Sequence, residues 1–352
     1  MTLPSALSPR VPHPALACTS LAISDSAGNL YHGRTLELTE ELPCQLTYYP
    51  TGTAFRKLAV DGSQAISYSN HSPLLAITTP MYFDGGQHNM LEGFNGAGLS
   101  FSANMVREAR LDPLAAADYP ESIPVTALGE WALSLFSNVE QVTQAVNQGC
   151  FWSPVLKDLG GAVSPFHFAF YDKHGGSIVV EAKDGKFRVY NNPTRAMTNS
   201  PEFSWHLMNL NNYTQLTNKD CSVATLGNIR VVQPDSGIAT AALPASDTSV
   251  DRFIRAVFYT SYAPQADSAA EAVNILGHIM NRFDRLKNIT TDDMGESGPT
   301  GTPQSEYTLW TSLSDLSRGE LYIRSYSDLN YNRYSLAQYQ HATAPVFEPL
   351  NP

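Results

Sequence analysis

Short segments in which apolar and polar residues alternate recur along the chain, a pattern typical of strands with one face in a core. The clearest is 98–105, where four apolar residues alternate with Ser100, Ser102 and Asn104. The same pattern, interrupted by glycine-containing turns, predicts further strands at 167–171, 177–181, 187–190, 307–312 and 320–326. Such turns favour antiparallel neighbours.

A strand–turn–strand pattern follows the first seventeen residues of the chain. Residues 19–24 and 30–36 are the two predicted strands, and 25–29 have the composition of a turn. Cys18 therefore opens a strand.

Two regions space their apolar residues as helices do. Residues 124–147 predict two helices, the second capped at Ser137 or Asn138, and 251–262 with 268–283 predict two more. The order of strands and helices lacks the regular alternation of a doubly wound parallel sheet. We expect an α+β fold of two antiparallel sheets with helices outside.

Charge and composition exclude several classes of protein. With 22 basic and 33 acidic residues the formal charge is -11, and no basic cluster could neutralise a row of phosphates, so no nucleic-acid partner is expected. No apolar run approaches the roughly 18 to 20 residues of a membrane span, which excludes a transmembrane protein. The spacing of the four cysteines predicts no metal or cofactor site, and Cys44, Cys150 and Cys221 are interpreted as small buried residues.

The first seventeen residues are predicted to be removed from the chain. They end in Ala15-Leu16-Ala17, the small-x-small pattern of signal-peptidase cleavage before Cys18. Four prolines suit the apolar stretch of a secretory signal badly, so a truncated signal and a short pro-segment both stay open. A periplasmic or secreted location is favoured, with the cytoplasm as the alternative. Residues 18–352 form one predicted domain, with a long loop at 290–304.

The chemistry of the chain centres on Cys18. The sequence contains no G-x-S-x-G elbow, H-E-x-x-H motif, P-loop or Rossmann fingerprint. Cleavage before Cys18 would give it a free α-amine with a pKa of about 7.7 to 8.0, a usable base at neutral pH. Arg34, on the neighbouring strand, could stabilise a thiolate, and Glu37 could hold or orient the amine. The alternative is a surface Arg and Glu on an edge strand.

Five motifs, in order along the chain, resemble those of the choloylglycine hydrolase family, which includes conjugated bile salt hydrolases and penicillin V acylases. They are C-T-S-L with G-R-T-L-E at 18–21 and 33–37, G-F-N-G-A-G-L at 93–99, M-T-N-S-P with N-L-N-N-Y at 197–201 and 209–213, D-R-F-I-R at 251–255, and Y-T-L-W-T-S at 307–312. The resemblance covers about residues 18–330. It implies the four-layer αββα sandwich of N-terminal-nucleophile hydrolases.

The resemblance also implies a role for each matching residue. Cys18 would be nucleophile and base, Arg34 would lie beside its sulfur, and Asn199 would donate its side-chain amide to the oxyanion. Arg252 would complete the charged cluster. Where this chain has Glu37 the family usually has Asp, so the contact to the amine is expected to be re-aimed or made through water.

One position of the family pattern is ambiguous. The family's Tyr or Asn falls without a gap on Met105, and on Asn104 after a one-residue shift. Asn104 is favoured because it lies on the polar face of its strand, and its backbone N–H is expected to be the second oxyanion donor.

The activity implied is hydrolysis of a linear amide with a bulky apolar acyl group, such as a conjugated bile salt or penicillin V. An N-acyl homoserine lactone is the alternative substrate. A homo-oligomer, by analogy a tetramer, is the implied assembly. Two rival interpretations are a lipoprotein acylated on Cys18 and an inactive binding protein of the same fold.

Overall fold

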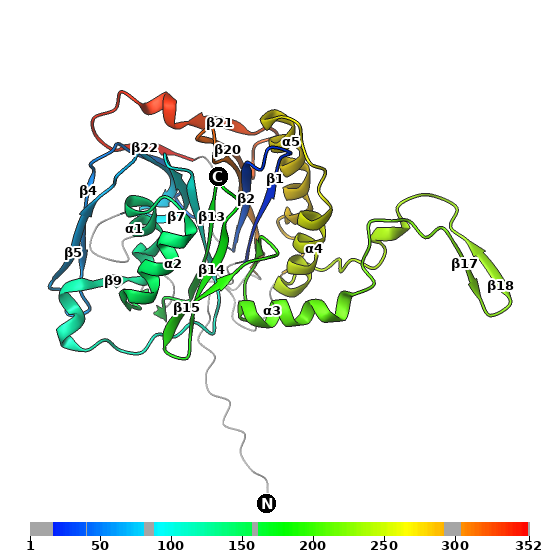
Figure 1. The fold of residues 1–352 in the computed structure, drawn as a ribbon, viewed down its shortest axis with the longest axis horizontal. Coiled ribbons are helices and arrows are strands. Elements are labelled where there is room, and N and C mark those ends of the chain that lie inside the picture. The colour runs from blue at the N-terminus through cyan, green and yellow to red at the C-terminus, as the bar shows by residue number, and fades with distance from the viewer. Residues whose placement is uncertain (1–16, 40, 81–87, 157–160, 292–303, 351–352) are drawn as a thin grey trace, which may run out of the picture.

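Two large antiparallel sheets lie face to face, with helices on both outer sides (Figure 1). The computed structural model describes residues 17–39, 41–80, 88–156, 161–291 and 304–350. The strand order is β16-β1-β2-β19-β20-β21 in one sheet and β15-β14-β13-β8-β7-β6-β3-β22 in the other. The predicted α+β fold of two antiparallel sheets between helical layers is confirmed.

Every predicted strand is present, and in the described residues the two sheets contain six further strands that the sequence did not predict. The six-stranded sheet comprises β16 (Ala196–Met197), β1 (Ala17–Ser24), β2 (Leu30–Leu38), β19 (Tyr307–Asp315), β20 (Glu320–Ser325) and β21 (Asn332–Ser335). The eight-stranded sheet comprises β15 (Lys186–Asn191), β14 (Ser177–Lys183), β13 (Phe166–Asp172), β8 (Leu99–Met105), β7 (Asn89–Asn95), β6 (Leu74–Thr79), β3 (Gln45–Tyr49) and β22 (Val346–Pro349). Smaller pairs are β4 (Ala54–Leu58) with β5 (Gln64–Ser69), β9 (Ser122–Pro124) with β10 (Cys150–Trp152), β11 (Val155–Leu156) with β12 (Ala162–Val163), and β17 (Val223–Leu226) with β18 (Ile229–Val232).

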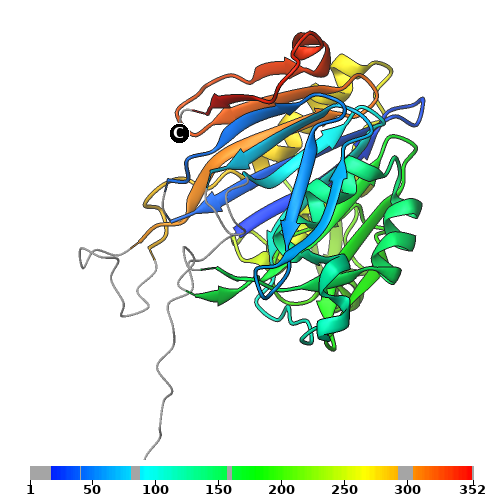
Figure 2. The ribbon, with the colours of Figure 1, turned by 90° about the vertical axis from the view of Figure 1, so that its left-hand side faces the viewer.

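Helices cover each sheet on its outer face. The α-helices of the described residues are α1 (Leu128–Leu135), α2 (Val139–Gln148), α3 (Phe203–Asn209), α4 (Ser249–Tyr262) and α5 (Ala269–Met280). Helices α4 and α5 pack on β1 and β2, and α1 and α2 pack on the eight-stranded sheet (Figures 1 and 2). Of the two predicted caps for α2 it is Asn138 that accepts a hydrogen bond from the Gln141 N–H. Gly33 lets α5 approach β2 closely, because a Cβ there would lie 2.8 Å from the Met280 side chain.

The hydrophobic core forms two layers. One fills the space between the sheets and beneath α4 and α5, and the other lies between the eight-stranded sheet and α1 with α2. Strand β8 is therefore buried on both faces, and its polar side chains point towards the six-stranded sheet. Ser100, Ser102 and Asn104 are all fully buried. Buried polar groups require hydrogen-bond partners, which places a polar layer inside the sandwich.

Residues 214–248, which include the β17–β18 hairpin, form an arm that projects from the body of the molecule (Figure 1). Its exposed apolar side chains are Val223, Leu226, Ile229, Val231 and Val232. Cys221, at the base of the hairpin, is exposed and Cys150 is half-buried, so the interpretation of these two cysteines as buried was wrong. Cys44 is buried as predicted.

No helix in the described part of the chain is long and apolar enough to cross a membrane.

Candidate active site

Cys18 lies near the start of β1, in the interior between the two sheets. Strand β1 begins at Ala17, which is still attached to Cys18. Ala17 pairs with Glu37 of β2, and Cys18 pairs with Leu36. Only 2% of Cys18 is exposed. The predicted leader otherwise lies outside the described residues. The site is thus that of the uncleaved chain, with its thiol covered.

Arg34 brings a positive charge to the Cys18 sulfur. Its Nη2 lies 3.6 Å from Cys18 Sγ and 2.6 Å from the carbonyl oxygen of Ala103, while its Nη1 donates to the carbonyl of Leu91. The guanidinium lies over the Trp310 ring, 5.2 Å from its centroid. Arg34 is buried and stands on a strand in the middle of its sheet, which excludes the surface-edge alternative for it.

The environment of Cys18 acts on its thiol in two directions. Burial raises the pKa of the Cys18 thiol and is the largest effect, while Arg34 lowers that pKa most strongly. Glu37 raises the pKa of Cys18 and Arg252 lowers it. The thiolate therefore depends on cations that the fold places nearby.

Asn199 and Arg252 hold the backbone of Cys18. Asn199 Oδ1 accepts hydrogen bonds from the Cys18 N–H and from Arg252 Nη2, each at 2.8 Å. Arg252 Nη1 donates to the Cys18 carbonyl at 2.7 Å and to Thr19 Oγ1 at 2.8 Å. Asn199 Nδ2 donates to the Met105 carbonyl at 3.0 Å. Asn199 thus joins β1 to both α4 and β8 in one buried network.

Two histidines fix the segment that carries Asn199. His206 Nε2 donates to the Asn199 carbonyl at 2.9 Å. His167 contacts the Thr198 carbonyl through Nε2 at 3.2 Å and Glu181 Oε2 through Nδ1 at 2.8 Å. No sequence motif marks these two histidines, because they come from β13 and α3 and only the fold brings them to this segment.

Glu37 lies on the helix-facing side of the six-stranded sheet. Its Oε1 accepts a hydrogen bond from Thr308 Oγ1 at 3.1 Å, and its buried Oε2 has no partner among the described residues. Burial raises the pKa of Glu37 to about 7, against the opposing effect of Arg252. The Ala17 N–H donates to Glu306. Two carboxylates therefore flank the peptide that is predicted to be cleaved.

Asn104 is fully buried, and its side chain bonds backbone carbonyls, including that of Cys18 at 3.4 Å. Its Nδ2 donates to the Thr198 carbonyl at 2.8 Å. The Val106 N–H donates to the Pro165 carbonyl on the β13 side, and backbone groups of a strand point to alternate sides. The Asn104 N–H is therefore directed at β13, where it belongs to the β-ladder, and not at Cys18.

The backbone of Met105 points to the opposite side of β8. Arg34 bonds the Ala103 carbonyl and Asn199 bonds the Met105 carbonyl, so both carbonyls face the site. The N–H of Met105 shares this direction, because the N–H and C=O of one strand residue point the same way. Pairing of β8 with β7 ends at Ser102. The site-facing backbone groups of Met105 are therefore not part of the ladder with β7.

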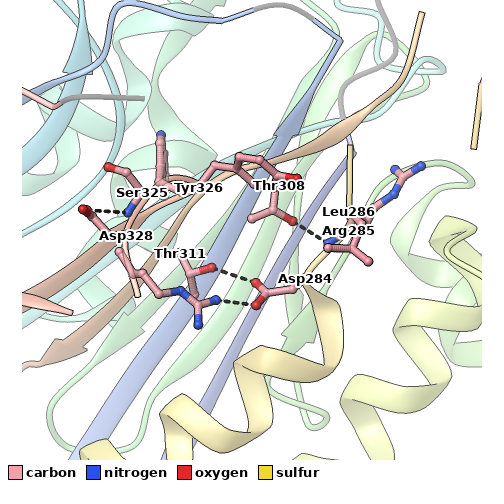
Figure 3. Close-up of a pocket in the computed structure, with 10 residues that line it drawn as sticks. Asp284, Arg285, Leu286, Thr308, Thr311, Ser325, Tyr326 and Asp328 are labelled. Carbon is pink, nitrogen blue, oxygen red and sulfur yellow. Dashed lines mark hydrogen bonds and ion pairs between the residues drawn. The ribbon is translucent and has the colours of Figure 1, made fainter. Parts of the chain in front are cut away.

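A cavity of about 180 Å³ lies between β19, β20 and the segment after α5 (Figure 3). Its lining residues are Asp284, Arg285, Leu286, Thr308, Trp310, Thr311, Arg324, Ser325, Tyr326 and Asp328. Asp284 accepts hydrogen bonds from Thr311 and Arg324 (Figure 3). Thr308 connects the cavity wall to Glu37, but Cys18 does not line this cavity.

Comparison with known proteins assigns the chain. The family model of linear amide C–N hydrolases, choloylglycine hydrolase family, matches residues 18–343. This chain belongs to that family. The family resemblance of the five motifs is confirmed.

The relatives of this choloylglycine hydrolase family member are bacterial hydrolases and acylases. The conjugated bile acid hydrolase of Lactobacillus acidophilus is 24% identical over 91% of this chain and 96% of its own length. The penicillin V acylase of Pectobacterium atrosepticum is 26% identical over 74% of this chain and 62% of its own length. A variant of the conjugated bile acid hydrolase from Clostridium perfringens has the same fold, with a TM-score of 0.80 at 22% identity, covering 95% of this chain and 97% of the other.

Within this family fold the structure brings together most of the residues that the motifs marked. Cys18, Arg34, Asn199 and Arg252 form one connected cluster, and Glu37 lies beside it on the other face of β2. In the described residues, no group of three or more His, Cys, Asp and Glu side chains is arranged to hold a metal ion.

Proposed function

We propose that this protein hydrolyses a linear amide with Cys18 as an N-terminal nucleophile, released by removal of residues 1–17. The observation that carries the proposal is the convergence on Cys18 of Arg34 at the sulfur and of Asn199 and Arg252 at the backbone. A structural cysteine in a core has no need of two buried cations. An arrangement of this kind is typical of an activated thiol.

In the proposed reaction the Cys18 α-amine accepts the thiol proton, and Sγ attacks the amide carbon of the substrate. The C–N bond of the resulting tetrahedral intermediate breaks as the amine leaves with a proton, and a thioester remains. Water then attacks the thioester, so that the acid leaves and the thiol is restored. Arg34 stabilises the thiolate before the attack.

The oxyanion of the tetrahedral intermediate needs donors fixed in advance. We assign them to the Asn199 side-chain amide and to the backbone N–H of Met105, in place of the N–H of Asn104. The direction of these groups supports the assignment. Asn199 Nδ2 lies 3.0 Å from the Met105 carbonyl oxygen, so the side-chain amide and the site-facing backbone of Met105 are already close together. Asn104 instead positions the segment through Thr198.

The names of the relatives support the proposed substrate class. Conjugated bile acid hydrolases and a penicillin V acylase share the family, and their substrates join a bulky apolar acyl group to an amine by a linear amide. The test is a panel of glycine and taurine conjugates of bile acids, penicillin V and N-acyl homoserine lactones, measured as kcat/KM. Hydrolysis of none of these amides by the cleaved chain would contradict the proposal and favour a binding protein of the same fold.

Glu37 is proposed to bind the new α-ammonium of Cys18, because its Oε2 is buried without a described partner. We expect Glu37→Asp, which restores the family's usual residue, to keep kcat/KM within about tenfold, and Glu37→Ala to lower it by about 100-fold. Steady-state kinetics of the cleaved variants measures both. Equal losses in the two variants would mean that the carboxylate is not what the site requires.

The pH dependence of stability gives a second readout for Glu37. Its folded pKa of about 7 lies above the usual value near 4.3 of an unfolded chain. A raised pKa means that folding is favoured while the carboxyl is protonated and that this contribution is lost as pH rises from about 4 through 7. In the uncleaved chain Glu37→Gln should therefore flatten the fall in unfolding free energy over that range, as measured by urea titration.

The exposed arm of residues 214–248 is proposed to dock on a second copy of the chain. An isolated two-stranded hairpin is marginally stable in water, and this one presents apolar side chains that nothing in the described part of the chain covers. Leu226→Asp combined with Ile229→Asp should reduce the molecular mass found by sedimentation velocity. Leu329→Asp, which alters a still more exposed apolar residue outside the arm, is the control. An unchanged mass in the double variant would contradict the proposal.

A further inference from the structure

Arg34 faces a buried carboxylate as well as the Cys18 sulfur. Arg34 Nε lies 3.8 Å from Glu92 Oε2, and both side chains are about 1% exposed. Neither atom has a hydrogen-bond partner among the described residues. Glu92 Oε1 accepts from Ser312 Oγ. A carboxylate in the interior is expensive unless it is paired, so its position beside Arg34, which contacts the thiol, calls for a role.

The position of Glu92 follows from the splitting of two strands. Strands β7 and β8 pair at Glu92 and Ser102 and separate beyond them, and the Arg34 guanidinium occupies the gap by bonding the carbonyls of Leu91 and Ala103. Arg34 thus reaches from its own sheet into the opposite one. The Arg34 guanidinium lies between the Cys18 thiol and the Glu92 carboxylate, which come from different sheets.

We propose that Glu92 is a positioning residue that shares the charge of Arg34, so that its protonation sets how strongly Arg34 stabilises the Cys18 thiolate. This rests on the proposed role of Cys18 as the nucleophile. When Glu92 is ionised it attracts the guanidinium and adds negative potential, which disfavours a second negative charge on the sulfur. When Glu92 is neutral, Arg34 acts on the thiolate alone.

While residues 1–17 are attached, the other groups around this pair are neutral near pH 7 or lie on another face. Burial lowers the pKa of His32 to about 3, and it raises the pKa of Tyr171 and brings that of Cys44 to about 11. Ser102 and Ser312 contribute hydroxyl groups only. Glu37 and Arg252 act on Cys18 from the helix-facing side of the sheet. Burial raises the pKa of Glu92 to about 7, against Arg34, so Glu92 changes charge in the pH range where the thiol is used.

The test measures the thiol directly and does not need turnover. Cleaved protein carrying Cys221→Ser, which removes the exposed thiol, is alkylated with iodoacetamide from pH 5 to 9, and modification of Cys18 is followed by peptide mass spectrometry. In wild type, coupling to Glu92 should spread the profile over a wide pH range. Glu92→Gln should narrow the profile, lower its midpoint and make alkylation about threefold to tenfold faster on its rising part.

A matched control is Glu130→Gln, which removes a buried carboxylate paired with Lys57 on the far side of the eight-stranded sheet and should leave the profile unchanged. If Glu92→Gln does not fold, Ser312→Ala tests the proposal instead. Loss of the Ser312 hydrogen bond favours the neutral form of Glu92, so this variant should also lower the midpoint of Cys18 alkylation. An unchanged Cys18 profile in the folded variant overturns the role of Glu92. A Cys18 that is unreactive in wild type would instead contradict its proposed role as the nucleophile.

Discussion

Protein that retains residues 1–17 is expected to be silent in amide hydrolysis, and Cys18→Ala in the cleaved chain is expected to lose turnover by about 10⁴-fold or more. While Ala17 is attached, the nitrogen of Cys18 is an amide, which has no basic lone pair. It already donates to Asn199 Oδ1 at 2.8 Å. The thiol has neither its base nor, at 2% exposure, access to a substrate.

Removal of Ala17 supplies the missing base. The strand then begins at Cys18, and a free amine of pKa about 7.7 to 8.0 stands next to the sulfur. Burial raises the pKa of the Cys18 thiol, so it depends on that base and on Arg34 to ionise. Cys18→Ser should also lose most activity, because a hydroxyl is a weaker nucleophile.

Intact-mass spectrometry of each preparation, paired with its hydrolysis rate, measures the first prediction. Circular dichroism and thermal unfolding should show that Cys18→Ala keeps its fold, and Cys221→Ser on the exposed arm should keep its activity. A species that retains residues 1–17 and hydrolyses amides at the full rate would end the N-terminal-nucleophile mechanism. A lipid mass on Cys18 would favour the lipoprotein interpretation.

Local pattern was enough to predict the fold class, but not strands β3, β6, β7 and β22 of the eight-stranded sheet. Where alternation or 3.6-residue spacing did mark an element, the limits agree to within a few residues, as for β8 (Leu99–Met105) and α4 (Ser249–Tyr262). Alternation shows which residues share a face, but not what covers that face. The polar face of β8 lies against the six-stranded sheet, where Ser102 hydrogen-bonds to His32.

The candidate site was predictable only where motifs carry it. Cys18, Arg34, Asn199 and Arg252 stand in motifs whose order resembles a family, whereas their connection arises from four separate elements. Glu92 could not be predicted, because its contact with Arg34 spans two sheets. The proposed Met105 N–H donor also could not be predicted from the sequence, since the direction of an N–H depends on ladder register and not on residue type.

Asn199→Ala is expected to lower kcat by about 100 to 1000-fold while the fold survives. Asn199 Oδ1 holds the Cys18 nitrogen and Arg252, and Nδ2 lies beside the backbone of Met105, so one side chain fixes the amine and presents the donor. Charge on the substrate oxygen exists only in the transition state, so kcat should fall more than KM rises. Steady-state kinetics with the best substrate of the panel provides the measurement.

Asn199→Asp separates the two functions of that side chain. Aspartate keeps an oxygen for the Cys18 amine and for Arg252 but loses the N–H donors, so an effect as large as that of alanine assigns the loss to the oxyanion. Recovery of most activity in Asn199→Asp would instead assign the role to orienting the amine. Asn212→Ala is the matched control, since this exposed asparagine bonds only locally to Asn209 and should leave kcat unchanged. A rate for Asn199→Ala within about threefold of wild type would remove Asn199 from catalysis, and the oxyanion would then have to rely on the Met105 N–H and Arg34.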